Sequence, residues 1–312
     1  QGDLHTHTSA SDGIHSLQHL TEHAAAIGLD FLGITDHNQP ISRASLPQLP
    51  GLTLIPGLEW THYQGHSNFL GHEAPFEGAF IANSEAEAGK IFQQAHQNGA
   101  LIVINHPFEE RYGFRFNFEN LPYDLFEVWN GPMRPANLQS IAYWDAQLKA
   151  GRKIMAVCGS DYHADTVFEQ LAGPCLHVYA QSSAEEDILE AVKTGRSYFT
   201  FQPNTLELEM HAEGVGLGGS LPWHQGLEME IELRRLHPGD QIKLIDCSGE
   251  QVLAVAPGLE AAADPASPSF TSSYASSVPI TRPGYARLEV WRSFFPGIPT
   301  LPALVSNPIF FD

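Results

Sequence analysis

The first two-thirds of the chain alternates short apolar runs with helix-like segments, and this order constrains the fold more than any other feature. A helix is predicted over 16–27, where Ser16 is a suitable N-cap, and the apolar run Asp30–Thr35 follows it. A second helix is predicted over 85–98, before the run Ala100–Ile104. Further strand-like runs are Leu52–Ile55, Leu125–Trp129 and Ile154–Val157. Strands that alternate with helices indicate βα units around a parallel sheet or barrel.

Residues that can bind metal ions follow these apolar runs. The chain begins with Asp3-Leu4-His5-Thr6-His7, and Asp161-Tyr162-His163 stands near the end of the alternating region. Side chains two positions apart on a strand point to one face, so each pair can direct two ligands toward one point. Between the pairs lie Asp12, Thr35-Asp36-His37, Glu59, His66 and Asn105-His106. Because the carboxyl ends of βα strands share one rim, we expect a single site of the histidine and carboxylate ligands that zinc, manganese and iron use.

The pattern changes after Phe201. Strand-like segments now alternate apolar and polar residues at period two, and Gly and Pro clusters separate them, at Leu206–Met210, Glu228–Leu233 and Gln241–Ile245. This pattern is typical of a small antiparallel β-sandwich. We expect a long loop over Ala261–Ser277 and closing strands at Ala286–Trp291 and Pro308–Phe311. The predicted domains are therefore 1–202 and 203–312.

Composition narrows the class of partner. The net charge is −20, from 16 Lys and Arg against 36 Asp and Glu, and a field of that sign repels nucleic acids and anionic membranes. No apolar run reaches membrane-spanning length, so we expect a small-molecule substrate and neither nucleic acid nor membrane as a partner. The chain starts at Gln1, which leaves the compartment open. A removed signal peptide would make the protein periplasmic or secreted, whereas a removed expression leader would give no information about the compartment. The oligomeric state is also open.

Five motifs together resemble the PHP (polymerase and histidinol phosphatase) superfamily. They are Asp3–Thr8 with Ser11-Asp12-Gly13, Ile34–Asn38, Gly57-Leu58-Glu59, Asn105-His106-Pro107 and Gly159–His163. Three further segments are similar to its CehA/McbA-type branch: Gly65–Asn68, Glu127–Gly131 and Ser306–Ile309. The resemblance covers about two-thirds of the chain. It implies an α/β fold with a distorted, seven-stranded βα barrel, followed here by the small antiparallel β-sandwich-like domain.

The resemblance also implies two or three divalent metal ions (Zn, Mn or Fe). His5, His7, Glu59 and Asp161 would bind the first ion, and Asp12, His37 and His163 the second. Glu59 would bridge toward a third ion, completed by His66 and His106. Many phosphatases of the superfamily have His where this chain has Asp12, and their next ligand lies farther after the Glu than His66 does.

We expect a metal-dependent hydrolase, and foremost a phosphoesterase that attacks a small phosphate ester through a metal-bridging hydroxide. Asp161, His163, Glu59 and Arg134 are the expected catalytic residues. Arg134 is one of four candidates to clamp an anionic substrate, with Arg43, Arg111 and Arg115. Asp36 and Asn68 are suited to fix imidazole tautomers.

Two alternatives stay open. Hydrolysis of a carbamate, carboxyl ester or amide uses the same activated water, and an aromatic slot beside Trp129 would favour an aryl carbamate, whereas converging Arg side chains would favour phosphate. Trp129 either lines the pocket or simply packs in the core. A non-catalytic module that binds metal or a partner is the alternative outside the enzymes.

Overall fold

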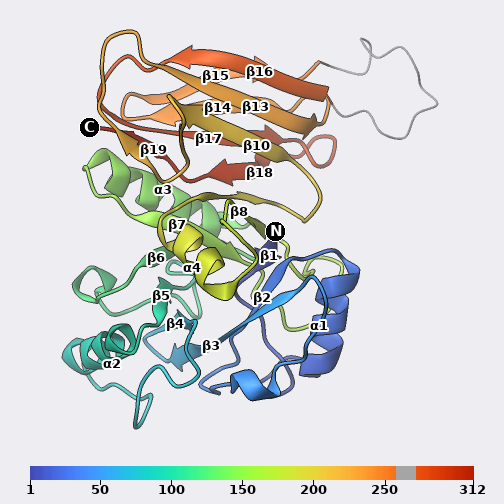
Figure 1. Cartoon of the computed structure of the whole chain (residues 1–312), viewed down its shortest axis with the longest axis vertical. Helices are drawn as coiled ribbons and strands as arrows, with labels where there is room; N and C mark the ends of the chain where they lie inside the picture. Colours follow the sequence, from blue (N-terminus) through green and yellow to red (C-terminus); the bar gives the residue numbers. More distant parts are fainter. Residues whose placement is uncertain (258–271) are drawn as a thin grey trace.

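The computed structural model describes residues 1–257 and 272–312, which form a mixed α/β molecule (Figure 1). Within these residues the α-helices are α1 (Leu17–Ala26), α2 (Glu85–Gln97), α3 (Pro135–Lys149) and α4 (Glu185–Lys193), with short 3-10 helices at Arg43–Ser45 and Phe118–Asn120. The strands of the first 202 residues are β1 (Gly2–Asp3), β2 (Phe31–Ile34), β3 (Thr53–His62), β4 (Gly65–Leu70), β5 (Leu101–Ile104), β6 (Leu125–Asn130), β7 (Met155–Gly159), β8 (Cys175–Val178) and β9 (Ser197–Thr200).

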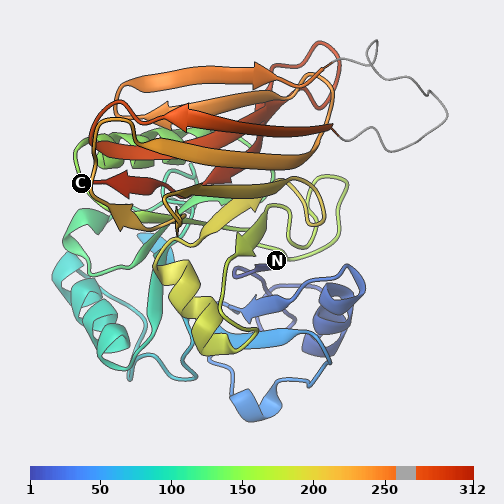
Figure 2. The same ribbon diagram turned by 45° about the horizontal axis from the view of Figure 1, so that its top comes forward.

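The strands after residue 202 are β10 (Glu207–Ala212), β11 (Val215–Gly216), β12 (Ser220–Leu221), β13 (Glu228–Leu236), β14 (Gln241–Asp246), β15 (Gly249–Val255), β16 (Ser272–Pro279), β17 (Gly284–Arg292), β18 (Leu301–Ser306) and β19 (Ile309–Phe311). They gather at one end of the molecule, and the helices α1 and α2 lie toward the other end (Figures 1 and 2). No helix of the described residues combines the length and hydropathy needed to cross a bilayer.

The predicted helices and strands of the alternating region are present. Helix α1 begins after Ser16, whose side chain accepts a hydrogen bond from the backbone N–H of His19, as a helix N-cap does. Helix α2 follows in the same way from Ser84. The prediction from strand–helix alternation is confirmed here because local capping and apolar periodicity act within a few residues of one another.

The sheet is mixed and not purely parallel. Its central path runs β1-β2-β3-β4-β5-β6-β7, and β4 is antiparallel to both β3 and β5. The segments that follow β1 and β7 meet at one isolated parallel bridge, Thr6 with Tyr162, while no ladder joins β1 to β7 among the described residues. These pairings do not confirm a closed barrel.

The same sheet continues into the last third of the chain. From β1 it passes through β8 and β9 to β18, β17, β19 and β12, and β14 with β15 extends it from β17. A second, four-stranded antiparallel sheet has the order β11-β10-β13-β16. One buried cluster contains Leu208, Met229 and Leu233 from this second sheet and Leu244 and Leu288 from the first. The period-two strands predicted after Phe201 are therefore confirmed, and their apolar faces meet between two sheets.

One local prediction is wrong in part, and one strand was missed. The loop predicted over Ala261–Ser277 lies outside the described residues up to position 271, but Ser272–Ser277 belongs to β16, paired with β13. Strand β18 falls between the two predicted closing strands and was not anticipated. Ser, Ala and Pro are weak strand formers, and here pairing with a neighbouring strand outweighs their local preference.

Candidate metal centre

The His-x-His and Asp-x-His motifs lie side by side although they come from opposite ends of the alternating region. The N–H of His7 donates to the carbonyl of Tyr162 (2.9 Å), and the N–H of Asp161 donates to the carbonyl of His5 (2.9 Å). These two hydrogen bonds join the segments after β1 and β7 at the Thr6–Tyr162 bridge. Alternation along the extended chain turns His5 and His7 to one side, toward Asp161. The matched pairs therefore form one corner of a site.

All nine candidate ligands converge on this corner. They form four overlapping groups, and within each group the ligating atoms lie within 4.8 Å of one another. The groups are His7 with Asp12, His37 and His163; His5 with His7 and Asp161; His5 with Glu59 and His106; and His37 with Glu59 and His66. A cation at the centre of any one group would meet at least three side-chain ligands, which is the number that catalytic metal sites use.

The grouping differs in part from the expected one. His66 and His106 were expected to complete a third site with Glu59. They fall in two groups, His66 with His37 and His106 with His5, but Glu59 belongs to both groups, and its Oε1 lies 3.2 Å from His66 Nδ1 and 3.3 Å from His106 Nε2. His66 is on β4, which runs antiparallel to β3 and pairs it with Thr61, two residues beyond Glu59. Glu59 and His66 therefore lie within strands, whereas the sequence had suggested positions at strand ends.

Glu59 lies at the centre of the cluster and is fully buried. Its two carboxylate oxygens face imidazole nitrogens on four sides, His37 Nδ1 at 2.6 Å, His66 Nδ1 at 3.2 Å, His5 Nε2 at 3.2 Å and His106 Nε2 at 3.3 Å. Burial opposes ionisation of Glu59, but the surrounding positive charge, that of His66 and His5 first, holds its pKa well below the ordinary value. Glu59 is thus a carboxylate that can bridge two neighbouring groups.

Several buried nitrogens fit a role as metal ligands. His5 Nε2, His7 Nδ1 and His106 Nδ1 have no hydrogen-bond partner among the described residues. The Nδ1 of His5 lies 2.9 Å from Glu127 Oε1, so a neutral His5, as a metal ligand must be, would keep its proton on Nδ1 and turn the lone pair on Nε2 toward Glu59 and Asp161. A buried nitrogen lone pair that faces two carboxylates without a proton between them is suited to a shared cation. The residues present therefore fit divalent metal ions.

Glu127 was quoted in a motif but received no role from the sequence. It is buried on β6, and besides His5 it accepts hydrogen bonds from the backbone N–H of His106 (2.7 Å) and from Asn130 Nδ2 (3.2 Å). Burial alone would lower the pKa of His5, but the charges of Asp161, Glu127 and Glu59 outweigh burial and raise it. The signal that could have identified Glu127 is a single carboxylate inside the apolar strand Leu-Phe-Glu-Val-Trp-Asn.

Asp36 and Asn68 do not contact imidazoles, contrary to expectation. Asp36 accepts hydrogen bonds from the N–H and hydroxyl of Thr8, both at 2.7 Å, and from the Ser11 hydroxyl at 2.6 Å. It thereby holds the loop that carries Asp12. Asn68 donates to the carbonyl of Leu4 at 3.1 Å and so fixes the backbone next to His5. Both side chains therefore position backbone near the candidate ligands.

Strained backbone occurs at two of the candidate ligands. Asp161 and His106 both have a positive φ, 53° and 27°, which residues other than glycine rarely adopt. Gly159 shows why the turn is tight: a Cβ there would lie 2.3 Å from His5 Cβ and 2.9 Å from Glu127 Oε1. Strain of this kind persists where surrounding contacts impose it, and it is common at functional sites.

A cavity of about 630 Å³ opens onto the cluster. Asp12, His37 and His163 are at its wall, and Asp12 Oδ1 lies 3.3 Å from His37 Nε2 and 3.1 Å from His163 Nε2. Arg111 and Arg134 line the same cavity. The other two candidate clamps do not: Arg43 pairs with Glu185 at 2.7 Å, and Arg115 donates to the carbonyl of Glu110.

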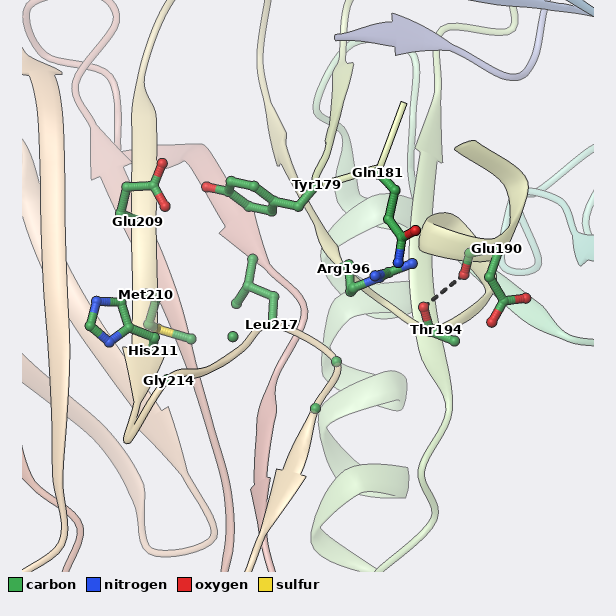
Figure 3. Close-up of a pocket in the computed structure, with 13 residues that line it drawn as sticks. Tyr179, Gln181, Glu190, Thr194, Arg196, Glu209, Met210, His211, Gly214 and Leu217 are labelled. Carbon is green, nitrogen blue, oxygen red and sulfur yellow. Dashed lines mark hydrogen bonds between the residues drawn. The ribbon is translucent and has the colours of Figure 1, made fainter. Parts of the chain in front are cut away.

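A larger cavity, of about 830 Å³, lies elsewhere, between α4 and the turn that joins β10 to β11 (Figure 3). Tyr179, Arg196 and Glu209 line it, and the Thr194 hydroxyl donates to the carbonyl of Glu190 at 2.7 Å. None of the nine candidate ligands lies there. Size alone does not identify a site, and the convergence of ligating atoms selects the smaller cavity.

Comparison with known proteins finds only weak similarity to solved structures. No protein-family model matches the chain, and no curated protein matches its sequence. One similar structure is a protein designated a metal-dependent phosphoesterase from Bifidobacterium adolescentis, with a TM-score of 0.36 and 16% identity over 55% of this chain and 91% of that one. Another is an amidohydrolase from Chromobacterium violaceum with bound sulfate and no metal, with a TM-score of 0.37 and 17% identity over 54% and 89%. Likenesses this weak carry no conclusion about activity, which has to come from the geometry of the chain's own residues.

Proposed function

We propose that this protein is a metal-dependent hydrolase that cleaves a small phosphate ester. The observation that supports the proposal is the convergence of nine His and carboxylate side chains in four overlapping groups, each within 4.8 Å, beside a cavity lined by Arg111 and Arg134. The whole chain contains only 16 Lys and Arg, so two Arg side chains at one small cavity are a local concentration of positive charge. Guanidinium groups recognise phosphate by paired hydrogen bonds.

The four groups name the residues that would hold two or three ions. His5, His7 and Asp161 would hold one, His7, Asp12, His37 and His163 a second, and Glu59 would bridge toward His66 and His106. When bound there, divalent cations lower the pKa of coordinated water toward neutrality and polarise a phosphoryl oxygen. Zinc, manganese and iron all accept this mixed ligand set.

The chain's own side chains would orient the ester. Arg134 is held at the cavity by Asn130 Oδ1 at 3.1 Å and Glu109 Oε2 at 3.4 Å, and its guanidinium is partly exposed. We assign it, with Arg111, to the phosphate oxygens. Hydrolysis forms a bond from the water oxygen to phosphorus, breaks the ester P–O bond and leaves a proton on the alcohol. Asp161 and His163 line this cavity, and the buried Glu59 lies behind it, within 3.3 Å of His66 and His106, which line it too.

A carbamate or carboxyl ester is the second candidate substrate. One observation favours it: Trp129 lines an apolar cavity of about 460 Å³ next to the metal centre. Its side chain is otherwise buried, and its Nε1–H donates to the carbonyl of Gly131 at 3.0 Å. The two Arg side chains favour phosphate, because a neutral carbamate offers no charge for them to bind.

The finer relationships are also proposals. We propose that the chain belongs to the PHP superfamily, supported by five motifs in the order the family has, and to its CehA/McbA-like branch, to which Gly65–Asn68, Glu127–Gly131 and Ser306–Ile309 are similar. We propose a distorted barrel in residues 1–202, supported by the Thr6–Tyr162 bridge, and a β-domain in 203–312, supported by the second sheet and the buried cluster beneath it. The net charge of −20 supports a small-molecule partner over nucleic acid or membrane.

The metal content of the purified protein tests the proposal. We expect mass spectrometry to find about two or three divalent ions per chain after dialysis against a metal mixture. A protein that binds none would not be a metal-dependent hydrolase.

Turnover is measured with aryl phosphates and with the matching aryl N-methylcarbamates. Asp161→Ala and His37→Ala should each lower kcat/KM by at least about a hundredfold while circular dichroism stays unchanged. His224→Ala, which removes an exposed histidine far along the chain, should keep activity. Retained turnover in either site variant would mean that the site is assigned wrongly, and metal binding without turnover of any ester would favour a binding module.

A further inference from the structure

An apolar cavity adjoins the metal centre. It has a volume of about 460 Å³, and among the described residues its only polar side chains are Gln170 and Gln202. No charged side chain lines it, although the neighbouring cavity of the metal centre is lined by acidic, basic and imidazole groups. Pro132 lines both cavities. We call the apolar cavity the apolar subsite, defined by Trp129, Met133, Val167, Phe168, Phe295 and Ile298.

Two chain segments separate the cavities and face both. At the end of β6 and in the turn after it, Asn130 and Arg134 line the metal cavity, while Gly131 and Met133 line the apolar subsite. In the segment after Asp161-Tyr162-His163, Glu169 lines the metal cavity, while its neighbours Phe168 and Gln170 line the subsite. A molecule that spans Pro132 would therefore meet cationic and metal-binding groups at one end and apolar side chains at the other.

The subsite leaves large apolar side chains in solvent. Val167 is 86% exposed and Phe168 81% exposed, and across the cavity Phe295 is 65% and Ile298 50% exposed. Exposure of such residues singly is ordinary, but a cluster beside a polar centre marks a place that an apolar group covers. The segment that carries Phe168 is ordered by Thr166, whose hydroxyl accepts from the N–H of Phe168 at 3.2 Å and of Glu169 at 2.8 Å.

The far wall comes from the last third of the chain and is firmly held. Phe294 packs edge-on against Phe201, with ring centroids 4.9 Å apart. The guanidinium of Arg292 lies over the Phe201 ring, 5.2 Å from its centroid, and is paired with the buried Asp240 through bonds of 2.8 and 2.7 Å. A preformed apolar wall binds a ligand without first having to be ordered.

We propose that the segment between β17 and β18 and the segment 167–170 select the substrate, by binding the apolar alcohol part of the ester whose phosphoryl group lies at the metal centre. This inference rests on the proposed function, since it takes the phosphoryl position from it. The occupant is one small amphiphilic ester, with an aryl or alkyl group that fits a cavity of this volume. In this proposal the last third of the chain contributes to the choice of substrate, through the segment between β17 and β18.

Phenyl phosphate and 4-butylphenyl phosphate test the proposal, because the two phenols have nearly the same acidity and differ in apolar area. Each buried methylene is worth about a fourfold gain, so kcat/KM should be at least about tenfold higher for the butyl ester. Phe168→Ala and Phe295→Ala should each reduce that ratio toward one. Phe80→Ala, which truncates an exposed Phe outside the subsite, is the matched control and should keep the wild-type ratio.

Binding supplies a readout that needs no turnover. Calorimetry with phenylphosphonate and 4-butylphenylphosphonate should give the same ratio of affinities and the same response to the two variants. Hydrolysis of both esters with equal kcat/KM, or a ratio unchanged in Phe168→Ala, would overturn the subsite and leave the proposed function standing. Absence of any hydrolysis, with the butyl preference kept in binding, would overturn the proposed function and leave the subsite. Sedimentation that shows a dimer lost in Phe168→Ala, with no butyl preference, would assign the apolar side chains to contact between copies and would overturn the proposal.

Discussion

At the scale of single residues, the metal centre depends on side chains that would not themselves touch an ion. Glu127 is buried and joins His5, the backbone of His106 and Asn130 in one set of hydrogen bonds. It orients one imidazole and holds the strained turn of another candidate ligand. Partners of this kind set the tautomer and basicity of a metal-binding histidine.

We predict that Glu127→Gln weakens metal binding by about 10- to 100-fold, because the neutral amide no longer stabilises the Nδ1–H of His5 as a carboxylate does. Competition with a chelator measures the affinity, and the far-ultraviolet circular dichroism should be unchanged. Glu228→Gln removes an exposed carboxylate on β13 and should keep the wild-type affinity. Equal affinity in both variants would show that Glu127 is structural only.

At the scale of elements, strand pairing decides which side chains meet. The antiparallel pair β8–β9 places His177 opposite Tyr198, with rings stacked at 4.5 Å and His177 Nε2 2.9 Å from the Thr200 hydroxyl. Burial lowers the pKa of His177 to about 3. The unfolded chain binds this proton near pH 6.5, so the folded state loses stability as the pH falls from about 6.5 toward 3.

We predict that His177 lowers the free energy of unfolding by about 2 kcal/mol between pH 7 and pH 5, because the loss begins near pH 6.5 and each pH unit below that is worth about 1.4 kcal/mol. Denaturant unfolding of the metal-free protein at both pH values measures the loss. His177→Gln should lose about 2 kcal/mol less than the wild type over this interval. His19→Gln, at an exposed position of α1, should follow the wild type, and a pH dependence shared by all three proteins would contradict the prediction.

At the scale of the whole molecule, one sheet runs from the metal centre into the last third of the chain. Strand β9 pairs with β18, and the cluster that contains Trp60 and Phe126 also contains Val305 and Phe310. Asn307 fixes the junction: it is fully buried, accepts from the N–H of Ala156 at 2.8 Å and donates to the carbonyl of Ala156 at 3.0 Å. The side chain thus continues the sheet beside β7, the strand that leads to Asp161.

We predict that Asn307→Ala lowers the free energy of unfolding by roughly 2–4 kcal/mol, because it leaves a buried N–H and carbonyl of Ala156 without partners. Denaturant unfolding measures the change, and metal affinity should fall with it because β7 positions Asp161. Asn120→Ala, at an exposed Asn bound to Glu85, is the matched control. A change below about 0.5 kcal/mol would show that water replaces the side chain at this junction.

The parts of the fold that the sequence predicts are those that depend on neighbours in the chain. Helices α1 and α2 follow from Ser caps and apolar periodicity, and the strands after Phe201 follow from alternation at period two. Strand β4 was missed, because its direction depends on pairing with β3 and β5. The same reason explains β18, which is central in the sheet although Pro302 lies within it.

The candidate site divides in the same way. The types and order of the nine ligand candidates can be predicted from the sequence. Metal binding requires His and carboxylate side chains, and their motifs are short and local. Their grouping, the separation of His66 from His106 and the parts of Glu127 and Asn307 depend on which strands pair and in which direction. Pairing joins residues more than a hundred positions apart through hydrogen bonds and burial, and no short stretch of sequence contains that information. The His-rich motifs therefore indicate that a metal centre is built, and the folded sheet determines where each ligand stands and what lies beside it.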